Sequence, residues 1–192
     1  MLPFFCFAHN GEFITAQWAW HVDGSAELTL TVDYESNLWI KNAADFQQAA
    51  DTFLELHTSQ QTTPLSASQA SKHYAAAQHL DPRSPLGHSA EELAQNYQLG
   101  ILHYQWKTPP AARTLKVPPA CPQTFILWMA DEQQPQQEIR WNIMIGGDES
   151  PLITRAPSRQ SSWLMAAWVI FGLGLILLTR YLLKKIPGRC GH

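Results

Sequence analysis

Histidine is the residue type whose chemistry stands out in this sequence. Its imidazole titrates near neutral pH and is the commonest protein ligand of transition metals. Seven histidines precede the apolar stretch near the C-terminus: His9, His21, His57, His73, His79, His88 and His103. No two of them have the close spacing of a local metal-binding motif. Each one alone is also consistent with a structural role, so the pattern indicates metal binding only where the fold gathers several of them.

The first eight residues have the features of the end of a secretory signal peptide. An apolar run is followed by Cys6 and Ala8, which occupy the −3 and −1 positions of a small-x-small cleavage site. The alternative is a short hydrophobic first strand. We predict that residues 1–8 are a signal-peptide remnant, and either interpretation keeps the following domain outside the cytoplasm.

Cleavage after Ala8 would make His9 the N-terminal residue. Its amine and its ring could then bind one metal ion together, and copper favours such nitrogen ligands. A second imidazole would complete the site, and His21 or His103, both at solvent-facing positions of predicted strands, are the candidates. The sequence thus predicts a copper site of His9 with His21 or His103 as one possible function.

Recognisable catalytic motifs are absent from the sequence. It contains no G-x-S-x-G, H-E-x-x-H, P-loop or C-x-x-C pattern. An enzyme is not excluded on this ground, because catalytic triads are assembled in space. We predict a binding or accessory protein, and we assign no catalytic residue.

Residues 163–183 form the longest apolar stretch, with one charge near its end. A helix of this length spans about 31 Å, close to the hydrocarbon thickness of a bilayer. The alternative, a buried helix of a soluble core, suits a domain of this size poorly. We therefore predict a single transmembrane helix. Its predicted contacts with membrane lipid are aromatic and basic side chains, namely Trp163, Trp168, Arg180, Lys184 and Lys185.

The distribution of charge predicts the orientation of this helix. The tail at 184–192 contains basic residues and no acid, which is typical of the cytoplasmic side. All 16 acidic residues lie before Trp163, where nine basic residues leave a formal net charge of −7. We predict that the N-terminal part is periplasmic or otherwise extracytoplasmic. Its acidity argues against nucleic acid as a partner.

Period-two alternation predicts that this outer part is a β-domain. Residues 14–22 and 26–34 alternate apolar and polar side chains on the two sides of Asp23 and Gly24. Alternation around an Asp-Gly pair is a strong hairpin signal. Further strands are predicted at 101–106, 125–129 and 139–145.

These strands predict a mainly β fold, an antiparallel β-sandwich over residues 9–157. A linker at 158–162 would join it to the membrane helix. Four tryptophans are predicted in the core of the sandwich: Trp18, Trp20, Trp128 and Trp141.

Residues 43–98 interrupt the strand pattern and are predicted to form a helical insertion. Its predicted features, in chain order, are a helix capped by Asn42 with an apolar stripe from Phe46 to His57, an alanine-rich stretch at 68–79, and a capping box of Ser89 and Glu92. These segments are weakly hydrophobic, so we expect them to lie against one edge or end of the sheet.

Several short stretches resemble a known family. They are Ala-His-Asn-Gly at 8–11 after an apolar run, Pro-Pro-Ala-Ala-Arg at 109–113, the strand at 125–129, and Gly-Asp-Glu-Ser-Pro at 147–151. Together they resemble the extracytoplasmic N-terminal region of HupE/UreJ-type membrane proteins, over most of residues 8–165. The resemblance implies a link to nickel or cobalt uptake, which that family carries out through several membrane helices.

The predicted span departs from that family because it contains no histidine and no aspartate. Ion pathways need polar groups inside the membrane, so this chain is not expected to transport ions alone. The resemblance implies an anchored accessory domain that acts beside a membrane-protein partner. The alternatives are the copper-binding protein described above and a structural subunit of a larger membrane complex.

Overall fold

A computed structural model describes residues 13–58, 61–87, 89–109, 113–131, 141–154 and Phe171. The chain divides into two units, Met1–Arg155 and Ala156–His192, and in the second only Phe171, which has a helical backbone, is described. The first unit is mainly β, which confirms the predicted fold class at that level. Its elements are β1 Phe13–Trp20, β2 Ala26–Asp33, α1 Ala43–Phe53, β3 Glu55–Thr58, β4 Thr62–Pro64, η1 Leu65–Ala67, β5 Ser71–Ala77, α2 Ala90–Ala94, β6 Leu99–Trp106, β7 Arg113–Lys116, β8 Thr124–Asp131 and β9 Asn142–Met144.

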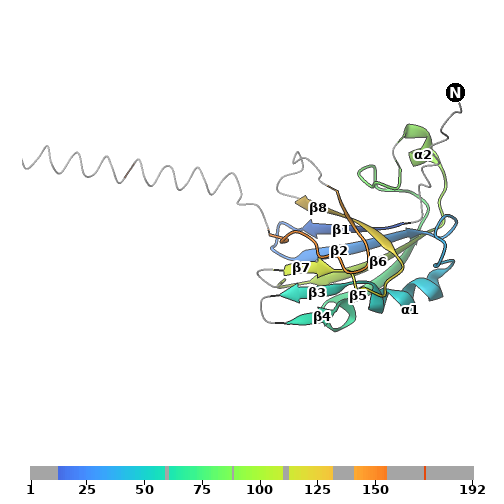
Figure 1. Cartoon of the computed structure of the whole chain (residues 1–192). Coiled ribbons are helices and arrows are strands. Elements are labelled where there is room, and N and C mark those ends of the chain that lie inside the picture. Colours follow the sequence, from blue (N-terminus) through green and yellow to red (C-terminus); the bar gives the residue numbers. More distant parts are fainter. Residues whose placement is uncertain are drawn as a thin grey trace, which may run out of the picture. The chain divides into compact units, whose positions relative to one another are not determined.

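The strands form two sheets around one hydrophobic core. The larger sheet has the order β5-β6-β2-β1-β8-β9, and the smaller has the order β4-β3-β7. Buried side chains of both sheets and of α1 belong to the same core cluster. The strands of the two sheets run in roughly the same direction, and α1 lies at one end (Figure 1).

The β1–β2 hairpin confirms the alternation seen in the sequence. Trp18 pairs with Leu28, and Trp20 pairs with Ala26. The connecting turn contains Gly24 with φ of +89°, a conformation that side chains other than glycine rarely adopt. One face of the hairpin therefore points into the core, and the other face carries polar side chains.

The sheets are not purely antiparallel, so that part of the fold prediction is wrong. β8 pairs with β1 in parallel over its whole length, from Phe13 and Thr124 to Trp20 and Asp131. A parallel pair requires a long crossover, and here the chain passes through the smaller sheet between the two strands. The nearly continuous apolar sequence of β8 suits a strand that is covered on both faces.

The helical insertion predicted at 43–98 is only partly present. α1 is capped by Asn42, whose side chain accepts hydrogen bonds from two backbone N–H groups, and α2 has its capping box. The alanine-rich stretch instead forms strand β5, which pairs with β6. His57 lies on β3, past the end of α1. Alanine has the highest intrinsic helix propensity, but tertiary context commonly overrides propensity, and here the segment pairs with the edge of β6 as a strand.

For the last strand, β9, the alternation of the sequence was assigned to the wrong faces, so the side chains predicted to be buried are exposed. Met144 is buried on β9, whereas Ile143 and Trp141 are 70% and 50% exposed. Because side chains alternate along a strand, choosing the wrong phase turns every residue to the other side. The core prediction for Trp141 is therefore wrong, while those for Trp18 and Trp20 are confirmed. Trp128 is buried but does not belong to the core cluster that the two sheets share.

Two close contacts inside the first unit have consequences for stability. A Cβ added at Gly100 on β6 would lie 2.0 Å from the Tyr34 hydroxyl oxygen.

Arg113 of β7 is 3% exposed, and its guanidinium lies 5.3 Å and 4.7 Å from the ring centroids of Trp18 and Trp20. Its Nε and Nη1 atoms have no hydrogen-bond partner, so this buried cation is held by aromatic rings.

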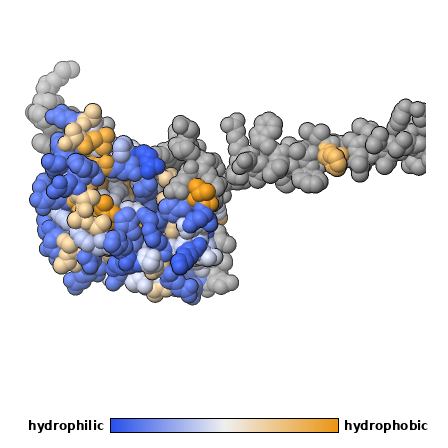
Figure 2. Space-filling view, turned by 180° about the vertical axis from the view of Figure 1, so that it is seen from behind, coloured by the Kyte–Doolittle hydropathy of each residue, from blue (hydrophilic) through white to orange (hydrophobic). Residues whose placement is uncertain are grey.

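The surface of this unit is mainly hydrophilic on the face shown in Figure 2, where hydrophobic residues form small separate patches. Among the described residues of the first unit, the exposed large hydrophobic side chains are Val22, Leu38, Trp39, Trp141, Ile143, Ile145 and Leu152.

Candidate functional site

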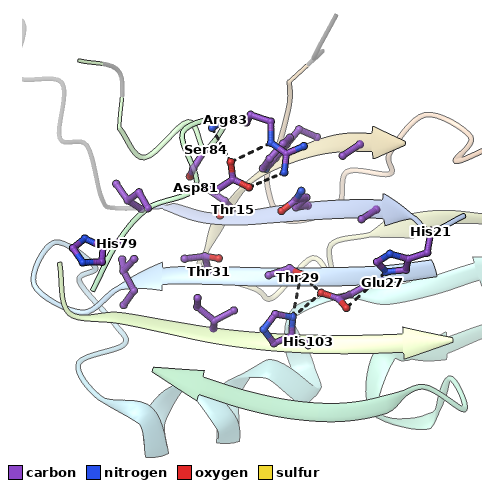
Figure 3. A pocket seen from close by; sticks show the side chains of 17 residues that line it. Thr15, His21, Glu27, Thr29, Thr31, His79, Asp81, Arg83, Ser84 and His103 are labelled. Carbon is purple, nitrogen blue, oxygen red and sulfur yellow. Dashed lines mark hydrogen bonds and ion pairs between the residues drawn. The ribbon is translucent and has the colours of Figure 1, made fainter. Parts of the chain in front are cut away.

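The candidate site is a groove on the face of the larger sheet that points away from the shared core. It has a volume of about 620 Å³. Strands β1, β2, β6 and β8 form its floor, and the segment after β5 forms one side (Figure 3). Its lining residues are Thr15, Gln17, Ala19, His21, Glu27, Thr29, Thr31, His79, Leu80, Asp81, Arg83, Ser84, Leu99, Ile101, His103, Trp128 and Ala130.

Strand pairing explains why this floor is polar. On β1 and β2 the apolar side chains point into the core, so the intervening residues share the opposite face. The register places Thr15 beside Thr31 and Gln17 beside Thr29. Hydroxyl and amide groups therefore lie side by side along the floor and can exchange hydrogen bonds with a polar ligand.

Glu27 is the centre of one end of the groove. Its carboxylate accepts hydrogen bonds from Gln105 Nε2 at 2.6 Å, His103 Nδ1 at 2.7 Å and Thr29 Oγ1 at 2.8 Å. His21 Nε2 lies 3.9 Å from Oε2 of the same carboxylate, whereas His103 contacts Oε1. Figure 3 shows His21, Glu27 and His103 gathered at this end.

The environment of Glu27 favours its ionised form. Burial raises the pKa of its carboxyl, but the hydrogen bonds from Gln105, His103 and Thr29 lower it more, so the pKa lies below its ordinary value. The side chain is only 15% exposed. The groove thus contains a fixed carboxylate at neutral pH, positioned by neighbours on β2 and β6.

An ion pair forms another part of the wall. Arg83 Nη2 lies 2.9 Å from Asp81 Oδ2, and Arg83 Nε lies 3.1 Å from Asp81 Oδ1. Burial raises the pKa of Asp81, but the hydrogen bonds and charge of Arg83 lower it more, and the bond to Asp81 raises the pKa of Arg83. The guanidinium lies 5.5 Å from the Trp128 ring centroid. The charges of Arg83 and Asp81 neutralise each other, and the guanidinium of Arg83 covers the ring of Trp128.

The predicted metal ligands are brought together only in part. His21 and His103 lie on the same face and flank Glu27, while His9 lies outside the described residues. Within the part of the chain that the structure describes, no group of three or more His, Cys, Asp or Glu side chains is arranged to hold one metal ion. The copper site therefore stays a prediction.

The remaining histidines are scattered. His57 lies 3.0 Å from Glu149 Oε1, outside the groove, and His79 lines the groove away from Glu27 (Figure 3). His73 on β5 pairs directly with His103 on β6, with ring centroids 6.2 Å apart. His88 lies outside the described residues.

Sequence reasoning did not identify Glu27, Gln105 or His73 as site residues. The alternation of β2 places Glu27 and Thr29 on the solvent-facing side, so their face was predictable. Their partners on β6 were not predictable, because more than 70 residues separate the paired positions, and neither was the pairing of His73 with His103, which are 30 residues apart.

The described part of the groove does not form a hydrolytic triad. His103 Nδ1 contacts Glu27 and Thr29, and the described lining contains one serine, Ser84, which lies beside Arg83 and away from His103 (Figure 3). A triad needs the hydroxyl at one ring nitrogen of the histidine and the acid at the other, whereas Thr29 and Glu27 both contact Nδ1 of His103.

The predicted membrane segment lies almost wholly outside the described residues. Among those that are described, no helix is long and apolar enough to cross a membrane. The residues predicted to anchor it, namely Trp163, Trp168, Arg180, Lys184 and Lys185, lie outside the described part of the chain, as do residues 1–8 and the linker at 158–162.

The chain matches no protein-family model, no curated protein and no solved structure. The resemblance to HupE/UreJ-type proteins therefore stays a prediction that rests on short motifs.

Proposed function

We propose that this chain is a single-pass membrane protein whose outer β-sandwich domain binds a small polar cation in the groove and does not catalyse a reaction. Residues 163–183 would anchor the domain in lipid, with the tail at 184–192 in the cytoplasm. The domain would act as an accessory or binding module beside a membrane-protein partner.

The observation that carries the proposal is the fixed carboxylate of Glu27. Counting histidines as neutral, the groove-lining residues carry a net charge of −1, because Arg83 cancels Asp81 and nothing charged cancels Glu27. Three hydrogen bonds hold the carboxylate in place before any ligand arrives. A preorganised charge in a concave, partly apolar site favours a ligand of opposite charge.

The neutral part of the floor supports a ligand that also forms hydrogen bonds. Thr15, Gln17 and Thr31 present hydroxyl and amide groups beyond Glu27 along the strands. An organic amine with one or two further polar groups would match this arrangement: its ammonium group would approach Glu27, and its remaining donors would reach the floor.

The alternative functions have less support from described contacts. The copper-binding protein requires His9 as a ligand, and His9 lies outside the described residues. A structural subunit of a membrane complex needs no groove. A role in nickel or cobalt handling follows from the family resemblance alone.

Binding can be tested with the full chain in lipid nanodiscs. Putrescine is the cationic probe and succinate, a dicarboxylate of similar length, is the anionic probe, each followed by saturation-transfer NMR. We expect putrescine to bind in preference to succinate, and we expect Glu27→Gln to weaken putrescine binding at least tenfold. Equal binding of both probes, or unchanged putrescine binding by the variant, would contradict the proposal.

A steric variant separates loss of charge from loss of the site. Ala19 lies on the groove floor, so Ala19→Trp should fill the groove and abolish putrescine binding. Ala44 is exposed on α1, on another part of the domain, and Ala44→Trp is the matched control. Loss of binding by both variants would indicate nonspecific damage, and loss by neither would place the ligand elsewhere.

A further inference from the structure

His73 and His103 form a cross-strand histidine pair at the β5–β6 edge of the larger sheet. They occupy directly opposed positions in the antiparallel register. Their ring centroids are 6.2 Å apart, and the ring planes differ by 28°. Opposed side chains on neighbouring strands have Cβ atoms about 5 Å apart, so the backbone holds the two imidazoles near each other.

The separation of the rings permits both to bind one ion. A zinc–nitrogen bond of 2.0–2.1 Å puts a coordinated ring centroid about 3.2 Å from the metal, so two coordinated rings lie at most about 6.4 Å apart. The observed 6.2 Å is below this limit. A modest rotation of the exposed His73 side chain would bring its ring closer to His103 and narrow the angle between the two metal–nitrogen bonds toward the tetrahedral value that zinc prefers.

Glu27 sets the tautomer of His103. A carboxylate offers only hydrogen-bond acceptors, so His103 Nδ1, at 2.7 Å from Glu27 Oε1, carries the hydrogen of the neutral ring. Its Nε2 then carries the lone pair that a metal requires. This is the carboxylate–histidine arrangement that commonly supports metal ligands in proteins, where the second partner orients the ring and raises its basicity.

The charges around the pair also suit a cation. Glu27 supplies a negative charge behind His103. Lys72, the neighbour of His73 on β5, points to the opposite face of the strand and lies 2.8 Å from Asp51 on α1. His73 is exposed on the edge strand, so an ion with its water ligands can reach the pair from solvent.

We propose that His73 and His103 bind a divalent transition-metal ion, with Glu27 as the positioning residue and water in the remaining coordination positions. Imidazole ligands select ions of the zinc, copper and nickel group over calcium and magnesium. The metal site shares Glu27 and His103 with the groove and adds His73, which is not among the residues that line the groove.

Zinc binding by the full chain in nanodiscs tests this proposal, by competition with a chromophoric chelator at pH 7.5. His73→Ala should weaken zinc binding at least tenfold. His79→Ala removes an exposed histidine outside the pair and is the matched control, with zinc affinity expected to stay within twofold of the parent. Equal affinities for parent and His73→Ala, or equal losses in both variants, would overturn the proposal and leave the pair as a stacking contact.

A second variant tests the role of Glu27. Glu27→Gln keeps both histidines but removes the carboxylate, and loss of such a supporting partner costs about 10- to 100-fold in metal affinity. In the parent, zinc should also shift the ring-proton NMR signals of His73 and His103 and leave those of His79 unchanged. His73→Ala should keep its putrescine binding, so failure of the metal site and failure of the groove are distinguishable.

Discussion

The Glu27→Gln variant probes stability as well as binding, because Glu27 links β2 to β6. Its carboxylate accepts three hydrogen bonds, from Gln105, His103 and Thr29. A glutamine keeps the shape but has one acceptor oxygen, and its NH₂ group would face donors. Hydrogen bonds to a charged group contribute about 1.5–3 kcal/mol and neutral ones about 0.5–1.5 kcal/mol. Allowing for partial exposure, we expect a loss of roughly 2 kcal/mol at pH 7.

The effect should depend on pH in a defined direction. The pKa of Glu27 is lower in the folded chain than its ordinary value of 4.5, since the three hydrogen bonds outweigh the opposing effect of burial. A carboxyl with a lowered pKa contributes stability above its unfolded pKa, and this contribution is lost as the pH falls through the folded value. The difference between parent and variant should therefore be full at pH 7 and shrink below about pH 4.5.

Thermal unfolding of the full chain in mild detergent, followed by tryptophan fluorescence, measures this difference. For a chain of this size, 2 kcal/mol corresponds to a fall in melting temperature of about 4–8 °C at pH 7. Glu35→Gln, at an exposed position after β2, is the matched control and should melt with the parent. A Glu27→Gln variant that melts with the parent at pH 7, or whose deficit persists unchanged at pH 3.5, would refute the reasoning.

Three further substitutions test packing and capping in the same melting assay. Gly100→Ala should destabilise the domain by about 1–3 kcal/mol, because the new methyl group overlaps the Tyr34 ring; unchanged stability would show that Tyr34 moves aside easily. Arg113→Met should raise stability by about 1 kcal/mol, because burial lowers the pKa of Arg113 to about 10 and no described carboxylate compensates it; a clear loss would mean that its aromatic contacts dominate. Asn42→Ala should cost about 1 kcal/mol by removing the cap of α1, and no change would contradict the capping role.

Local patterns in the sequence predicted the parts of the fold that depend on neighbouring residues. Alternation around Gly24 predicted the β1–β2 hairpin, and Asn42 and Ser89 predicted the starts of two helices. Each signal acts within a few residues, where backbone conformation and hydrogen bonding decide the structure. These are the features that a single sequence can specify.

Long-range pairing decided the parts that were missed. The alanine-rich segment became strand β5 because β6 offers it an edge, and the parallel alignment of β8 with β1 joins residues more than 100 positions apart. On β9 the phase of alternation was ambiguous, since Trp141 and Ile143 are apolar and yet Met144 is the buried residue. Propensity cannot choose between such arrangements without the neighbouring strand.

In the candidate site too, local sequence predicted which way single residues face, while long-range strand pairing decided which residues meet. His21 and His103 were predicted at solvent-facing positions, and both lie in the groove. Their relation to Glu27 follows from the register of β2 against β6, and the pairing of His73 with His103 follows from the register of β5. A histidine pattern in the sequence therefore indicated which residue type to examine but not which residues meet.

The central proposal is that the domain containing the groove lies on the extracytoplasmic side of a membrane. Labelling of intact cells with a membrane-impermeant maleimide tests it most directly. Glu91 is exposed on α2, so Glu91→Cys places a thiol on the domain surface, and Cys190 is the native thiol of the tail. We predict that the thiol at position 91 is labelled in intact cells, above the level of the parent chain, and that Cys190 is labelled only after permeabilisation. Labelling of Cys190 in intact cells, with protection of position 91 until lysis, would contradict the proposed anchoring and orientation.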